Sequence, residues 1–430
     1  MTTHSAPLDE AVTELRIENR SLHSYIRDRY DQIESIENDI HAWVNGAKPQ
    51  SQIDAEANAL EHRYPDPKTR PPLYGTPVGV KDIIHVEGLP TYAGSTLPPS
   101  RLVDSEATIV TRLREAGALI LGKTVTTEFA YFEPGDTRNP HNIEHTPGGS
   151  SSGSAAAVAA GMCPLALGTQ TVGSVIRPAS YCGIIGYKPS FGRIPTDGII
   201  PLSKSVDHVG LFTQDVAGMK CAASVCVDNW NTSTIKRKPI LGIPDDRYLN
   251  QSTNEGLSSF ESSISKLKSS GYEVIRTKVL EEIKEINTRH NRLVAAEAAI
   301  AHDDWFEEFT NQYSEKTIEL ISEGQIVDVV EVINGRRGRR DLRQRLHEAM
   351  NQNRVDIWIS PSAPGTAPKG IENTGNPVMN LPWTHAGVPT VTIPTKRIDG
   401  LPLGMQCAGR FGDDERLITW CDRIKQELAL

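Results

Sequence analysis

The segment from Gly148 to Pro189 constrains the fold of this chain more than any other. It reads GGSSSGSAAAVAAGMCPLALGTQTVGSVIRPASYCGIIGYKP, so glycine and serine turns flank an apolar run of alanine and valine. Flexible linkers share the glycine and serine content, but they contain no apolar run that needs burial. The pattern therefore predicts a loop, a buried helix, a short strand and a second loop, in that order.

Two serines and one lysine are the chemically distinctive residues of this region. Ser150 and Ser174 each lie in a tight glycine turn, and upstream Lys81 ends the apolar stretch GTPVGVKD. A serine hydroxyl is a weak nucleophile without a base in reach, and a lysine becomes such a base only when burial lowers its pKa. The residues predict a relay in which neutral Lys81 accepts a proton from Ser150, Ser150 accepts one from Ser174, and Ser174 attacks a carbonyl.

The second serine turn also predicts a binding site for the oxyanion that such an attack creates. Successive backbone N–H groups in a tight turn point at one spot and bind negative charge. The candidate donors are the amides of Thr171, Val172, Gly173 and Ser174.

These motifs resemble the amidase signature family, the Ser-cisSer-Lys hydrolases. The resemblance rests on the Lys81 strand motif, the GGSSSGS and QTVGS turns, the passage CGIIGYKPS, and a C-terminal passage from Asn380-Leu381-Pro382 to Gly404-Met405-Gln406. It implies that Lys81 is the catalytic lysine, that a cis peptide bond precedes Ser150, and that Ser174 is the nucleophile. It also implies an α/β fold, a large mixed and twisted sheet of about eleven strands sandwiched by helices.

The sequence departs from the family pattern at two positions. Val172 stands where the family usually has glycine, and a β-branched residue rarely takes a positive φ, so either the turn needs none there or it is distorted. Arg177 lies three residues after Ser174 instead of two, as in the malonamidase-type bacterial amidases. Arg177 is a candidate for binding a substrate carboxylate through its two-pronged guanidinium, or for a structural role beneath the catalytic loop.

The 430 residues are expected to form a single domain, because Lys81, Ser150 and Ser174 must converge. Helices are predicted over 8–30, 31–40 and 53–62 within an N-terminal helical part, 8–64. The catalytic core spans 74–215, charged helices over 255–350 are expected to shape the substrate pocket, and 355–430 return to the sheet.

The composition limits which binding partners and which cellular compartment are expected for this chain. The net charge of −9 argues against a nucleic-acid surface, and no apolar run approaches the length of a membrane span. No secretory signal is visible, and six scattered cysteines are typical of a cytoplasmic protein with reduced thiols. His141 and His145 lie in a loop between prolines, so neither a metal nor a cofactor is predicted. The expected partner is a small amide or carbamate, and assembly into a homodimer stays open.

The leading function is hydrolysis of the C–N bond in small amides through an acyl-enzyme on Ser174. The same relay serves a carbamate (urethane) or ester hydrolase, which only the pocket and leaving group distinguish. A third interpretation is an amidotransferase A-like component of a complex, made less favourable by the sequence around Arg177 and by the acidic charge balance. A binding protein with an inactive site is least compatible with the intact set of Lys81, Ser150 and Ser174.

Overall fold

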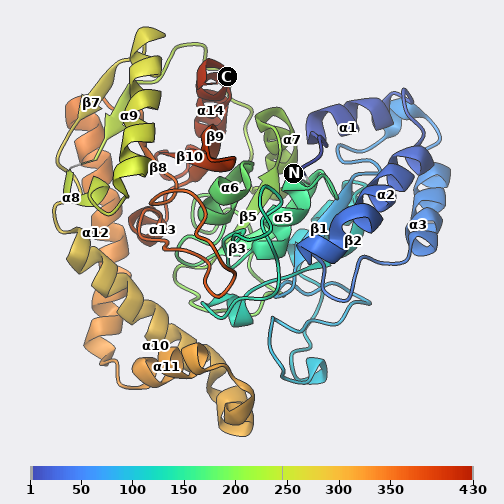
Figure 1. The fold of residues 1–430 in the computed structure, drawn as a ribbon, viewed down its shortest axis with the longest axis horizontal. Helices are drawn as coiled ribbons and strands as arrows, with labels where there is room; N and C mark the ends of the chain where they lie inside the picture. Colours follow the sequence, from blue (N-terminus) through green and yellow to red (C-terminus); the bar gives the residue numbers. More distant parts are fainter. Residues whose placement is uncertain (1–2, 245, 429–430) are drawn as a thin grey trace.

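The computed structural model describes residues 3–244 and 246–428. It contains one mixed sheet in the order β2-β1-β3-β5-β4-β9-β10-β8-β6-β7 (Figure 1). Strands β1, β2 and β3 are parallel to one another, as are β6, β7 and β8, and antiparallel pairs join the strands between these two groups. The strands are β1 (Pro77–Lys81), β2 (Leu119–Thr124), β3 (Leu165–Gln170), β4 (Ile185–Lys188), β5 (His208–Thr213), β6 (Leu241–Ile243), β7 (Val274–Arg276), β8 (Ile357–Pro361), β9 (Thr390–Ile398) and β10 (Leu401–Ala408).

The predicted α/β class with a mixed sheet is confirmed, but the expected eleven strands are ten in the described part of the chain. Ile84 and Ile199 pair only through an isolated bridge, which is too short to add a strand. The helical region 255–350 also contains a strand that the sequence pattern missed. Strand β7 has three residues, none of them fully buried, and so carries no readable alternation of apolar and polar residues.

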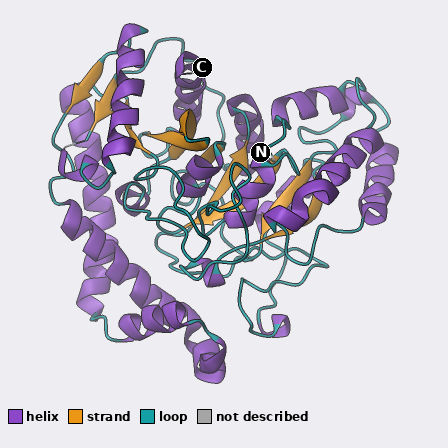
Figure 2. Cartoon of the chain, in the orientation of Figure 1, coloured by secondary structure: helices purple, strands orange, loops and turns teal. Residues whose placement is uncertain are grey.

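Side chains along the central strands alternate between two separate apolar cores. Leu165 and Leu167 of β3 pack into the larger apolar cluster, whereas Ala166 between them packs into the second cluster. Successive side chains of a strand point to opposite faces, so each face of the sheet must be covered. Helices provide that cover on both sides (Figure 2).

Two groups of helices form these layers. Helices α5 and α6 pack together and against strands of the sheet, while α7 and α14 pack together and against β5 and β9. Helices α11 and α12 both pack on α10, and the three helices extend away from the sheet (Figure 1). The bounds are α1 (Leu8–Arg16), α2 (Leu22–Ile40), α3 (Gln50–Arg63), α4 (Thr108–Glu115), α5 (Ser152–Ala159), α6 (Ile176–Cys182), α7 (Val216–Cys226), α8 (Asp246–Leu249), α9 (Asn254–Ser269), α10 (Ile283–Phe309), α11 (Glu315–Gln325), α12 (Val329–Asn353), α13 (Leu381–Ala386) and α14 (Asp414–Leu428).

The N-terminal helices divide at a different point from the predicted one. The break falls between Arg16 and Leu22, where Glu18 takes a positive φ of 60°. No break occurs at Tyr30, because the apolar positions Ile33, Ile36 and Ile40 continue the buried face of α2.

None of the helices in residues 3–244 and 246–428 has the length and apolar character needed to cross a membrane. All six cysteines are free thiols.

Candidate active site

The ends of two neighbouring strands bring the predicted residues together. Lys81 is the last residue of β1 and Thr169 lies next to the end of β3, and these strands run parallel side by side. The carboxyl ends of parallel strands meet at one edge of a sheet, which is where α/β proteins place their binding sites. Helix α5 packs on β3 and begins two residues after Ser150, so the Ser150 loop and the 171–174 turn reach this edge.

Lys81 is fully buried and contacts two hydroxyl groups. Its Nζ lies 2.7 Å from Ser150 Oγ and 2.8 Å from Thr169 Oγ1. Burial holds the pKa of Lys81 well below its ordinary value of 10.5, because the ammonium form loses its hydration. A neutral amine can donate to Thr169 and accept a proton from Ser150 at the same time, so the first link of the predicted relay has the geometry it needs.

Ser150 follows the one cis peptide bond, Gly149–Ser150, among the described residues. The Ser150 side chain is buried, and its carbonyl accepts from the amide of Thr127. The next residue, Ser151, exchanges hydrogen bonds of 3.2 Å with both the amide and the carbonyl of Thr169. The loop is thereby tied to the end of β3, with the Ser150 hydroxyl facing Lys81.

Ser174 lies in the turn between β3 and α6 and is 7% exposed. Within the described residues, no hydrogen bond joins its hydroxyl to that of Ser150. Catalytic hydrogen bonds are often long in a free enzyme and shorten when substrate binds. The second link of the relay therefore stays a prediction.

An oxyanion site requires backbone amides that do not already donate hydrogen bonds within the protein. In the part of the chain that the structure describes, none of the turn and loop hydrogen bonds uses the N–H of Thr171, Val172, Gly173 or Ser174. The amides of Val175 and Ile176, just beyond, both donate to the side chain of Gln170. The four candidate donors are therefore available, and their role in binding an oxyanion stays a prediction.

The valine in this turn is accommodated without a left-handed backbone, since Val172 is not among the residues with positive φ. Its side chain is partly buried and packs against the larger apolar cluster. Gly173 is the position that cannot take a side chain. A Cβ there would lie 2.5 Å from Asn380 Oδ1 and 2.8 Å from Pro377 Cβ, so the segment around 377–380 closes directly over the turn.

Two residues that the sequence did not single out, Thr384 and Asp207, support this turn through hydrogen bonds. Thr384 donates to the carbonyl of Val172, Gln170 donates to Thr384, and Thr171 donates through its hydroxyl to Asp207 at 2.6 Å. Thr384 and Asp207 lie 213 and 36 residues from the turn residues they support, counted from Thr171. No spacing in the sequence links them to Ser174, and only the fold brings them together.

Arg177 is 2% exposed and its guanidinium is engaged by the protein itself. It donates to the carbonyls of Gly149 and Gly375 and to the hydroxyl of Thr374. Burial lowers the pKa of Arg177 to about 10, which leaves the group charged at neutral pH. The contact with Gly149 ties Arg177 to the peptide that precedes Ser150, while binding of a substrate carboxylate stays a prediction.

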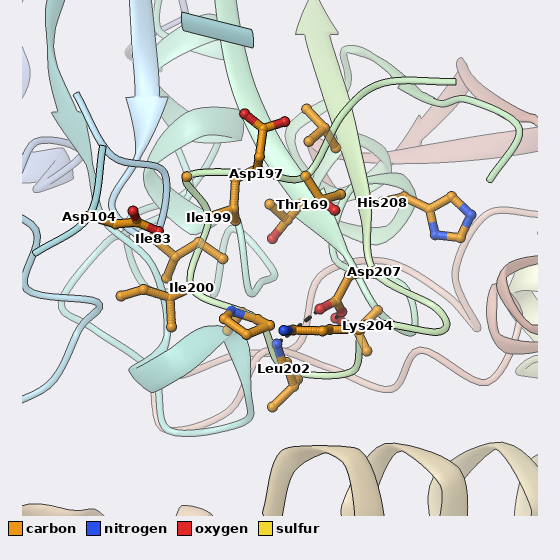
Figure 3. Close-up of a pocket in the computed structure, with 16 residues that line it drawn as sticks. Ile83, Asp104, Thr169, Asp197, Ile199, Ile200, Leu202, Lys204, Asp207 and His208 are labelled. Carbon is orange, nitrogen blue, oxygen red and sulfur yellow. Dashed lines mark hydrogen bonds between the residues drawn. The ribbon is translucent and has the colours of Figure 1, made fainter. Parts of the chain in front are cut away.

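A cavity of about 370 Å³ opens beside the relay (Figure 3). The polar residues that line it include Thr169, Thr171, Lys204 and Asp207, so the cavity adjoins the threonine that contacts Lys81. The apolar wall comes from Ile83, Ile199 and Ile200. A pocket with apolar walls and a few polar groups fits a small organic molecule.

Comparison with protein families gives a match over most of the chain. The family profile described as amidase matches residues 24–418. The A subunit of glutamyl-tRNA(Gln) amidotransferase from Lysinibacillus sphaericus (strain C3-41) is 28% identical, over 99% of this chain and 97% of that protein.

Solved structures agree with this match. The crystal structure of an amidase superposes with a TM-score of 0.90 at 28% identity, covering 99% of this chain and 100% of the other. The peptide amidase of Stenotrophomonas maltophilia gives a TM-score of 0.84 at 23% identity, with coverage of 99% and 97%, and shares the fold.

Proposed function

The chain belongs to the amidase family, and on that premise we propose that it hydrolyses small linear amides through an acyl-enzyme on Ser174. The observation that carries the proposal is the contact between a fully buried Lys81 and the Ser150 hydroxyl at 2.7 Å. A lysine without hydration serves as a base, and the serine turn beside it supplies the nucleophile and free amides.

In the acylation step, Ser174 Oγ forms a bond to the amide carbon as its proton passes to Ser150 and that of Ser150 passes to Lys81. The carbonyl oxygen becomes an oxyanion that the 171–174 amides stabilise. When the C–N bond breaks, the proton returns from Lys81 through Ser150 to the leaving nitrogen. The amine departs neutral, and the acyl group stays on Ser174.

In the deacylation step, water replaces the amine at the same position. The relay takes a proton from the water while its oxygen bonds to the acyl carbon, and the proton then passes to Ser174 Oγ as the ester bond breaks. The products are a carboxylic acid and the free enzyme. No step needs a metal or cofactor, because the base and the oxyanion donors come from the chain itself.

A substrate panel tests the proposal. Matched amides, carbamates and esters of the same acyl group, each with and without a carboxylate, are incubated with the purified chain, and release of amine and acid is measured. We expect turnover of at least one neutral or acidic amide. Turnover confined to carbamates or esters would favour the urethane or ester alternative, and turnover of none would overturn the proposal.

Arg177 is expected to distinguish acidic from neutral amides, as the resemblance of SVIRPA to the malonamidase-type enzymes suggests. Arg177→Ala removes the contacts to Gly149 and Gly375, so Tm falls whatever the substrate. The discriminating measurement is the ratio of kcat/KM for acidic and neutral amides. We expect that ratio to fall at least about 30-fold, the effect of removing one partner of a buried charge pair. An equal loss for both substrates would leave Arg177 a purely structural role.

A second candidate function is that of an amidotransferase A-like component of a complex. The observation that favours it is the end-to-end alignment with the glutamyl-tRNA(Gln) amidotransferase chain of Lysinibacillus sphaericus. Purification of the tagged chain from its own host distinguishes the two. Stoichiometric co-purification of partner chains, with amidase activity only in the complex, would favour this candidate over a stand-alone hydrolase.

A further inference from the structure

We propose that Asp207 is a positioning residue for this site, which holds the oxyanion turn through Thr171 and places a negative charge at the cavity that Thr169, a hydroxyl partner of Lys81, also lines. The inference rests on the proposed function and adds a residue to it. Asp207 is partly buried, lies immediately before β5 and lines the same cavity as Thr169 and Thr171 (Figure 3).

Three hydrogen bonds hold the carboxylate of Asp207. Oδ1 of Asp207 accepts from Thr171 Oγ1 at 2.6 Å, and Oδ2 accepts from the amides of Leu202 and Ser203, both at 2.9 Å. Two of these three donors are backbone N–H groups, which can only donate, so they favour the ionised carboxylate. Asp207 thereby links the 202–203 segment to the first residue of the oxyanion turn.

Asp207 also has an electrostatic effect on Lys81, the base of the relay. Burial alone lowers the pKa of Lys81, and the negative charge of Asp207 acts in the opposite direction. A base works best when its pKa is near the working pH, and a nearby anion opposes the lowering of the lysine pKa by burial. The pKa of Asp207 is itself raised by burial and by Glu297, while its three donors lower it.

The other titratable groups near the two residues are paired, exposed or neutral. Glu297 of α10 forms an ion pair with Arg336 and accepts from Ser203, the residue whose amide serves Asp207. Asp82, next to Lys81, forms an ion pair with Lys123. Lys204 is exposed, and the pKa of the adjacent His208 is lowered by burial, so that ring is neutral.

The chain offers a substitution that separates the charge from the tether. In Asp207→Asn the amide oxygen can accept from Leu202 and Ser203 while the amide nitrogen donates to Thr171 Oγ1, so the links survive without the charge. The probe is phenylmethanesulfonyl fluoride, which reacts with an activated serine. Its rate of reaction with Ser174 is measured against pH by mass spectrometry, alongside amide turnover.

For Asp207→Asn we expect the acidic limb of the rate profile to move to lower pH. Lys81 must be neutral to act, and the loss of a nearby negative charge lowers its pKa, so the base stays active in more acidic solution. Asp104→Asn is the matched control, because Asp104 lines the same cavity but bonds locally to Ser105. Its limb should not move. If the acidic limb of Asp207→Asn lies at the same pH as that of Asp104→Asn, the proposed electrostatic effect of Asp207 on Lys81 is overturned.

Thr171→Val and Asp207→Ala test the tether. Each removes the link to the turn, and we expect kcat to fall about 10-fold to 100-fold, the rate equivalent of one charge-assisted hydrogen bond. Thr171→Val keeps the Asp207 charge, so the acidic limb of this variant should stay at the wild-type pH. Thr171→Val also tests the hydrogen-bond link if Asp207→Ala does not fold. Unchanged kcat in Thr171→Val would overturn the positioning part. Wild-type protein that leaves Ser174 unmodified and turns over no amide would overturn the proposed function itself, and the inference with it.

Discussion

Substitution of Ser174 by alanine is expected to lower kcat for amides by about 10⁴-fold to 10⁶-fold, because the nucleophile and its relay act as a unit. The folded structure should persist, since the variant loses only one small hydroxyl group at a position that is 7% exposed. Wild-type protein incubated with a slowly hydrolysed acyl substrate should gain the mass of one acyl group. Peptide mapping should locate that mass on Ser174.

Ser180→Ala is the matched control for this experiment. Ser180 lies six residues further on, in α6, and its buried hydroxyl has no hydrogen-bond partner in the described residues. Its loss should change neither kcat nor the acyl adduct. An adduct on Ser150 or on a cysteine of the wild-type protein would contradict the assignment of Ser174 as nucleophile.

The residues of the site that the sequence predicts share one property, which is that each lies within a short motif. Lys81 ends an apolar strand, and Ser150 and Ser174 lie in glycine turns. The resemblance of these short motifs to the amidase signature family marks the three residues as candidates, and their catalytic roles stay predictions. The fold class follows from the alternation of strands and helices. The fold prediction is confirmed because hydrophobic periodicity and turn residues act over a few neighbouring positions.

The supporting residues could not be predicted in the same way. Thr169, Asp207 and Thr384 are ordinary polar residues in sequence, and their roles depend on contacts across strands and loops. The contacts of Arg177 with Gly149 and Gly375 likewise required the fold, although a structural role beneath the loop was one of its two interpretations. Chain segments far apart meet at the edge of β1 and β3, and no local pattern records which side chains face each other there.

Substitution of Lys81, the base of the relay, is expected to have the second large effect on kcat and to change the pH profile of the activity. Lys81→Met is expected to lower kcat for amides by about 10²-fold to 10⁴-fold, the contribution of a general acid and base. The loss should be smaller for activated aryl esters, because their leaving groups need no proton. The wild-type profile should rise with pH through an acidic limb, as the relay loses the proton that blocks it, and that limb should disappear in the variant.

Lys188 provides the control that makes this result specific. It is a second fully buried lysine, and burial lowers its pKa to about 7, so it titrates near neutral pH. Its Nζ donates to the carbonyls of Pro189 and Val388, and it forms no hydrogen bond with a serine among the residues that the structure describes. Lys188→Met should therefore keep the acidic limb, whatever it does to Tm. Loss of the limb in Lys188→Met, or near-normal amide hydrolysis by Lys81→Met, would contradict the relay, because the proton would then be taken by a group other than the one that contacts Ser150.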